Sequence, residues 1–119
     1  MWRILFIVAG LYNFAAGLMP LLAPAQSLVY AGLPPDTSLF MVQSMGALLT
    51  TFGIGYFMVA RDLSLRPIVW LGVIGKSIFV AIIVIHYTSQ SISFSVAAPG
   101  IGDALFVALF LLFLLRRPA

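Results

Sequence analysis

The sequence predicts an all-α fold in which a bundle of four transmembrane helices forms one integral membrane domain over residues 1–119. Hydrophobic residues make up 63% of the chain and charged residues only 8%. A soluble domain carries roughly 25% charged residues to keep its surface wet. In addition, four apolar stretches each reach the about 17–25 residues that a helix needs to cross a hydrocarbon layer ~30 Å thick. Water is therefore not the main solvent of this protein.

The first two predicted spans cover residues 4–23 and 39–60. Pro20 lies inside the first span, where it frees the carbonyl of Ala16 and should bend the helix near one end. The connection 24–38 begins with a fairly apolar stretch that is compatible with lying along the membrane interface. It continues into a Pro-Pro-Asp turn, followed by Thr and Ser residues able to cap the second span.

The start of the chain also has features of a secretory signal. Arg3 precedes an apolar run, and Ala23-Pro24-Ala25 resembles an A-x-A cleavage site. The run is about 20 residues long, whereas the apolar region of a signal peptide has about 7–15. We therefore interpret this stretch as the first membrane span.

The third and fourth predicted spans cover residues 67–87 and 99–115. Each begins with a proline in the first helical turn, where the missing N–H does no harm. The fourth span is the shortest, so it has little freedom to tilt unless the helix starts before Pro99. The connection between these spans is rich in serine and polar.

The arginines predict the orientation of the bundle. Arg3 precedes the first span, Arg61 and Arg66 lie between the second and third, and Arg116 and Arg117 follow the fourth. With four crossings, all five fall on one side, and the two opposite connections contain no lysine or arginine. The positive-inside bias therefore places both termini in the cytoplasm.

Aromatic residues near the ends of the spans agree with this orientation. Trp2, Trp70 and Tyr56 are expected at the cytoplasmic interface, and Tyr30 and Tyr87 at the other. The net charge of +3 comes from arginines that anchor the topology and can contact anionic lipid, so it does not indicate a nucleic-acid partner. Membrane lipids are the expected surroundings.

Each span carries a polar residue that lipid would reject. Asn13, Lys76 and Thr50 lie near the predicted midplane, whereas Gln43 and Asp103 share a level roughly 6–9 Å further out, at ~1.5 Å rise per residue. Helical spacing places most of these residues on stripes with small neighbours that permit close helix approach. The stripes are Ala9, Asn13 and Gly17; Gln43, Gly46, Thr50 and Gly53; and Gly72, Lys76 and Phe79. The pattern predicts a polar pocket that opens away from the cytoplasm.

Lys76 is the residue that most needs a partner. A lysine at the centre of a span costs about 2.5–3.5 kcal/mol, which the aliphatic residues around it can offset at about 0.3–0.6 kcal/mol each. Asp103 is the only acidic residue within a span, so we hypothesise a Lys76–Asp103 pair. Both side chains should lean toward the start of their own helices, and hence apart. Water, Asn13 or Gln43 is therefore a possible bridge.

These five residues, Lys76, Asp103, Asn13, Gln43 and Thr50, are the candidate ligand-binding or relay residues. For the uncharged three, we favour a structural role in interhelical hydrogen bonds. For the charged two, we favour a functional role, because charge inside a membrane is costly and usually marks a ligand or ion path.

The residue types available exclude several kinds of chemistry. The absence of cysteine excludes disulfides, thiolate chemistry and Cys-based zinc or iron–sulfur sites. His86 is the only histidine, so we interpret it as an interfacial polar residue rather than a metal ligand. A Ser/His/Asp triad drawn from His86, Asp103 and a loop serine has almost no specificity. We predict no catalytic residue, metal or cofactor.

Several short motifs resemble a known group of proteins. They are Gly53-Ile54-Gly55-Tyr56, Ala60-Arg61-Asp62, Pro67-Ile68-Val69, Gly75-Lys76 and Gly102-Asp103. Over nearly its whole length the chain resembles the small four-helix bacterial membrane proteins of the DoxX-like type. Some members are membrane subunits of quinone-linked oxidoreductases. The resemblance implies a place in the bacterial inner membrane, with Lys76 and Asp103 as the positions of interest.

Three functions are therefore open. The one we favour is a binding or accessory module whose pocket holds a small or lipophilic molecule, for example a quinone passed to a partner. The second is a small oligomeric transporter or channel that uses Lys76 and Asp103 as a relay. The third is a structural subunit of a larger complex. In each case we expect either a homo-oligomer or a partner membrane subunit.

Overall fold

Residues 1–116 of the chain are described by a computed structural model, and Arg117, one of the predicted topology anchors, lies outside them. Most of the described residues are helical, and there is no strand among them. The helices are α1 (Trp2–Leu22), α2 (Pro24–Ala31), α3 (Leu39–Arg61), α4 (Arg66–Thr88), α5 (Phe94–Ala97) and α6 (Pro99–Leu115).

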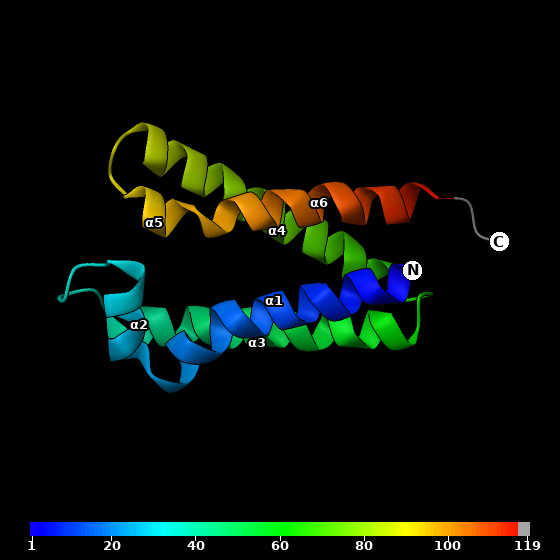
Figure 1. Ribbon diagram of the computed structural model, residues 1–119, viewed down its shortest axis with the longest axis horizontal. Coiled ribbons are helices and arrows are strands. Elements are labelled where there is room, and N and C mark those ends of the chain that lie inside the picture. The colour runs from blue at the N-terminus through cyan, green and yellow to red at the C-terminus, as the bar shows by residue number, and fades with distance from the viewer. Residues whose placement is uncertain (117–119) are drawn as a thin grey trace.

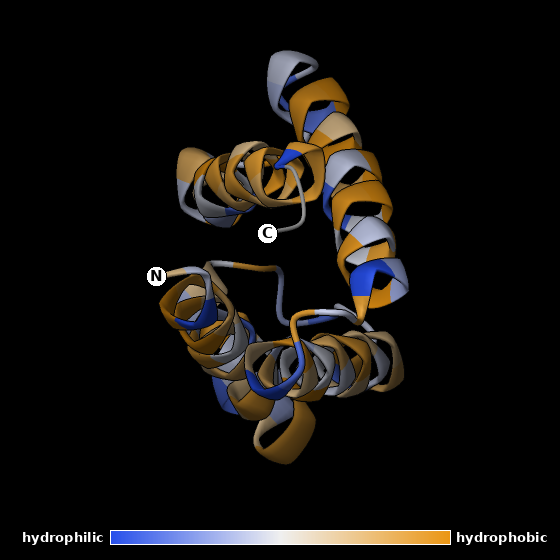
Figure 2. Cartoon of the chain, turned by 90° about the vertical axis from the view of Figure 1, so that its right-hand side faces the viewer, coloured by the Kyte–Doolittle hydropathy of each residue, from blue (hydrophilic) through white to orange (hydrophobic). Residues whose placement is uncertain are grey.

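The predicted four-span, all-α architecture is confirmed. Helices α1, α3 and α4 and the stretch Phe94–Leu115 are each long and apolar enough to cross a membrane, as in a small multi-pass membrane protein. Large apolar side chains such as Leu11, Leu48 and Ile78 are exposed on these helices, where lipid would cover them. Figure 2 shows mainly hydrophobic colours along the helices.

The spans form two antiparallel pairs, seen one above the other in Figure 1. We call α1 with α3 the first pair and α4 with α6 the second pair. The arginine end of the bundle is where α1 begins, α3 meets α4 and α6 ends; the opposite end, which carries α2 and α5, is the cavity end. The predicted grouping of Arg3, Arg61, Arg66 and Arg116 at one end is therefore present in the fold.

Glycines bring the first pair into close contact. A Cβ on Gly46 would lie 2.7 Å from the carbonyl oxygen of Gly17, and a Cβ on Gly17 would lie 2.9 Å from that of Gly46. Only glycine permits two helix backbones to approach in this way, which is how membrane helices associate without a hydrophobic driving force. The stripe predicted on the first span is also confirmed, because Ala9, Asn13 and Gly17 are all buried.

The two pairs meet at the arginine end through aromatic packing. Phe6 stacks on Phe110 with ring centroids 5.1 Å apart and meets Phe113 edge-on at 4.9 Å. The ring centroids of Tyr56 and Phe110 lie 5.1 Å apart.

Within the first pair, Arg3 on α1 donates hydrogen bonds to the carbonyl oxygens that end α3, those of Ala60 at 2.8 Å and Arg61 at 3.0 Å.

Two short helices at the cavity end were not predicted. In α2, Pro24 occupies the first turn and Gly32, with φ of 71°, ends the helix in the left-handed conformation. Both residues are helix-boundary signals. The apolar composition of residues 26–33 had instead suggested a segment lying along the interface. Helix α5 leads almost directly into α6, so the helical path of the fourth span starts at Phe94.

Candidate ligand cavity and its polar floor

A group of three buried polar residues connects the spans at mid-height; we call Asn13, Lys76 and Asp103 the polar node. Their exposed fractions are 3%, 7% and 5%. Lys76 Nζ donates to Asp103 Oδ1 at 2.5 Å and to Asn13 Oδ1 at 3.1 Å. Asn13 Nδ2 donates to the carbonyl oxygen of Leu49 on α3 at 3.1 Å. All four spans therefore contribute to one hydrogen-bonded network.

The hypothesised Lys76–Asp103 pair is direct, and the bridge that the sequence left open is not needed. Measured from the arginine end, Lys76 lies 10 residues after Arg66 and Asp103 lies 12 residues before Leu115. At ~1.5 Å per residue these depths are about 15 and 18 Å. The predicted separation of 6–9 Å was wrong because it was counted from Pro99, whereas the helical path begins at Phe94.

Three aromatic rings surround the ammonium group of Lys76. Its Nζ lies 5.4 Å from the ring centroid of Tyr12, 5.6 Å from that of Tyr56 and 5.5 Å from that of Phe106. Ring faces attract a cation at such distances, and more strongly when water is excluded. The prediction that Tyr56 is an interfacial ring is therefore wrong: it is 1% exposed and belongs to the core. Tyr12 and Phe106 lie one and three residues from members of the node, a spacing that could have revealed them.

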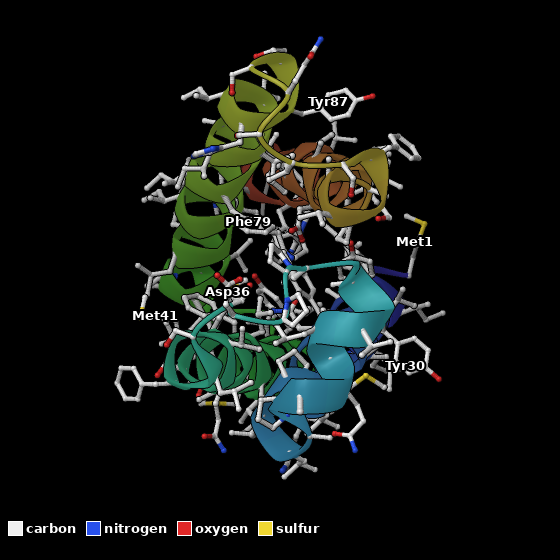
Figure 3. All side chains as sticks on the ribbon, turned by 90° about the vertical axis from the view of Figure 1, so that its left-hand side faces the viewer. Met1, Tyr30, Asp36, Met41, Phe79 and Tyr87 are labelled. Atoms are coloured by element: carbon white, nitrogen blue, oxygen red, sulfur yellow. The ribbon has the colours of Figure 1, made fainter. Side chains whose placement is uncertain are left out.

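Above the polar node, toward the cavity end, the two pairs separate around a cavity of about 540 Å³. Asn13 and Asp103 form part of its wall at the inner end, while Tyr30 and His86 belong to its outer part. Most of the wall is apolar, from residues that include Ala16, Met19, Val42, Met45, Leu49, Phe79, Ile82, Ile83, Ile92, Val96 and Pro99. Figure 3 looks into this end and shows Phe79 on the inner side of α4, between the two pairs.

A second, smaller cavity of about 200 Å³ lies between α3 and α4 and reaches the same node. Asn13, Met45, Leu49, Phe79 and Asp103 line both cavities. Lys76 lines only the smaller one, together with Leu48, Phe52, Tyr56, Gly72 and Gly75. Asp103 therefore borders both cavities, and its partner Lys76 borders the smaller one.

Asp103 is the member of the node that is best placed to meet a ligand. Its Oδ1 accepts from Lys76, while its Oδ2 has no hydrogen-bond partner within residues 1–116. An ionised carboxylate accepts hydrogen bonds on both oxygens. A hydroxyl or amine donor in the cavity could therefore bond to Oδ2 without breaking the Lys76–Asp103 pair.

Two of the candidate residues lie away from the cavities. Gln43 is exposed and donates to the carbonyl oxygen of Leu21 at 2.9 Å, so it satisfies the last turn of α1 instead of sharing a layer with Asp103. Thr50 faces the glycine contact of the first pair, where a Cβ on Gly17 would lie 2.8 Å from its Oγ1. Placing Gln43 and Thr50 in a pocket was wrong because one stripe of α3 was assigned to a single inward face. Helix α3 packs on α1 and borders the cavity with different sides.

His86 lies in the outer part of the cavity wall and is exposed. Its Nδ1 is 2.8 Å from Ser91 Oγ in the connection after α4. Among the described residues no group of three or more His, Cys, Asp or Glu side chains lies close enough to hold a metal ion. The arrangement at the cavity can accept and donate hydrogen bonds, and it offers no assembled nucleophile or metal site in residues 1–116.

No protein-family model, no curated protein and no solved structure matches this chain.

Proposed function

We propose that this protein binds a small amphipathic molecule in the cavity between its two helix pairs, alone or as an accessory subunit of a membrane complex. The observation that carries this proposal is the combination of an apolar cavity with a buried ion pair at its inner end. Small-molecule sites are typically apolar clefts of about 300–1,000 Å³ with a few well-placed polar groups. The cavity of about 540 Å³ meets that description.

The chemistry of the node suggests the polar part of the ligand. Asp103 Oδ2 can accept from a hydroxyl or amine, and the apolar wall suits a ring or a chain. A quinol, with hydroxyl donors on an apolar ring, meets both requirements. This agrees with the accessory role in a quinone-linked complex that the resemblance to DoxX-like proteins implies.

The packing at the arginine end favours a binding cavity over a channel. Phe6, Phe110 and Phe113 are fully buried between the pairs on that side of the node. They fill the space that a conducting path would need. A transporter or channel would instead carry an ion or solute across proteoliposomes, so flux above that of empty vesicles would favour it.

We further propose that the arginine end faces the cytoplasm of a bacterial inner membrane, as the positive-inside bias implies. The chain contains no cysteine, so a single introduced cysteine reports its own position unambiguously. Ser64→Cys, in the connection between α3 and α4, should react with an impermeant maleimide only after the membrane is opened. Ser89→Cys, beyond α4, should react in intact spheroplasts. The opposite pattern would reverse the orientation.

Binding is tested by native mass spectrometry of the protein released from lipid nanodiscs. We expect a retained mass between whole-protein multiples, and Ala16→Phe should remove it by filling the cavity. Ala104→Phe is the matched control, because Ala104 is exposed on α6 and lines neither cavity. Only whole-protein multiples from the wild type would contradict the proposal. The same spectrum gives the number of chains per particle and so tests the proposed oligomer.

A further inference from the structure

The smaller cavity opens on the side of the bundle. Met45 and Leu48 on α3 and Gly75 on α4 line it and are exposed. These positions lie within the spans, so the space outside them is occupied by the hydrocarbon of the bilayer. The opening therefore faces lipid chains.

Helices α3 and α4 stand apart at this opening. A Cβ added to Gly75 would meet no atom within 4 Å. One turn earlier, at Gly72, a Cβ would lie 2.7 Å from the hydroxyl oxygen of Tyr56. Helices α3 and α4 are therefore in close contact at Gly72, beside Tyr56, and no longer in contact at Gly75. Gly75 marks one edge of the lateral opening.

The two cavities border each other at the polar node. Phe79 and Asp103 are part of both walls, and Phe79 is only half-buried. Figure 3 shows the Phe79 ring between the two helix pairs. Phe79 is therefore one of the side chains that lie between the two spaces. The only acid at the junction is Asp103, which is 95% buried and has Oδ2 without a partner in residues 1–116.

We propose that the ligand is a single-chain amphiphile with a hydroxyl head, which lies beside Asp103 while its hydrocarbon chain passes between α3 and α4 into the bilayer. This inference rests on the proposed binding function and adds the class of ligand and its route. The cavity provides space for the head of the ligand, and the buried carboxylate at the junction accepts its hydrogen bond. The lateral opening lets its hydrocarbon chain reach the bilayer. A ligand of this class would reach the site from within the membrane.

The test is photo-crosslinking with a long-chain fatty alcohol that carries a diazirine near the end of its chain. The probe is incorporated into phosphatidylcholine nanodiscs with the wild-type protein, irradiated and mapped by peptide mass spectrometry. We expect adducts in residues 45–52 of α3 and 72–79 of α4. Gly75→Leu should lower their yield about tenfold, because its side chain occupies the opening.

Ala81→Leu is the matched control, since Ala81 is an exposed residue of α4 that lines neither cavity. Its adduct yield should equal that of the wild type. If the retained mass described above is present while the adducts spread evenly over lipid-facing residues, the binding function stands and the lateral route is wrong. Equal yields from Gly75→Leu and Ala81→Leu would also overturn the lateral route. If the wild type shows neither a retained mass nor localised adducts, the binding function itself is wrong.

Discussion

Both ends of this bundle carry large apolar side chains between the helix pairs, but they are packed differently. At the arginine end, Phe6, Phe110 and Phe113 are each 0% exposed and join the two helix pairs directly. At the cavity end the pairs separate, and Phe79 and Ile83 border open space. Stability is therefore concentrated at one end and free volume at the other. The polar node lies where the filled region gives way to the cavity.

The largest effect should come from removing a ring at the filled end. Phe110→Ala leaves a void that close-packed neighbours cannot fill, so we expect it to lower the free energy of unfolding by about 3–5 kcal/mol. Phe79→Ala, at the cavity end, should cost less than half as much because its ring already borders empty space. Reversible unfolding in mixed detergent micelles, followed by circular dichroism, measures both. Equal losses would mean that the two ends do not differ in packing.

Breaking the charged pair should cost nearly as much as the loss of Phe110. Lys76→Met leaves Asp103 buried without its partner, for which we expect a loss of about 3 kcal/mol. The double variant Lys76→Met, Asp103→Leu should recover most of that loss, since apolar replacement of a whole buried pair is often neutral. A double variant less stable than Lys76→Met would show that the pair itself holds the fold together.

Asn13→Ala should have an intermediate effect. The change removes the hydrogen bond to the Leu49 carbonyl and one of the two acceptors of Lys76. Hydrogen bonds between membrane helices contribute about 0.6–2 kcal/mol, so we expect a loss in that range. The same micelle titration measures it. No loss at all would show that the hydrogen bonds of Asn13 do not help to hold the bundle together.

Gln43→Ala should have a smaller effect, about 0.6 kcal/mol or less, because Gln43 is exposed and only completes the end of α1. It should leave the retained ligand mass unchanged. Loss of that mass would show that Gln43 contributes to the binding site, although it lines neither cavity.

The smallest effect concerns the connection at the arginine end. Hydrogen bonds from the side chain and backbone of Ser64 lower the pKa of Asp62. A lowered folded-state pKa gives stability that is present above the unfolded value and is lost as the pH falls through the folded one. Ser64→Ala should raise the pKa of Asp62 toward that of an ordinary aspartate, measurable by NMR titration. An unchanged pKa would remove the Ser64 hydroxyl as a cause and leave only the backbone N–H of that residue, which alanine keeps.

The fold was predictable from the sequence because lipid imposes simple requirements. Length and hydropathy determine the spans, and the bounds of α1, α3, α4 and α6 differ from the predicted ones by at most two residues at any end. Helix α2 was missed because its boundary signals, Pro24 and Gly32, lie in a stretch too short and too mixed to show a periodic pattern.

The site was predictable only in part. Charge inside a membrane is rare enough that Lys76 and Asp103 could be paired from the sequence alone, and Asn13 lies on a clear stripe. The aromatic surround of Lys76 could not be foreseen, because phenylalanine and tyrosine are also ordinary core and lipid-facing residues. Gln43 and Thr50 were misplaced because the side of α3 that meets α1 depends on glycine contacts between the two helices.

The role of the charged pair in ligand binding is tested most directly by comparing retained ligand in the wild type and in the double variant Lys76→Met, Asp103→Leu. Both proteins are released from identical nanodiscs and weighed by native mass spectrometry, after their unfolding midpoints have been measured. We expect midpoints that differ little and a retained mass that is present in the wild type and absent from the double variant. A double variant that keeps the same mass would show that the Lys76–Asp103 pair is not part of the binding site.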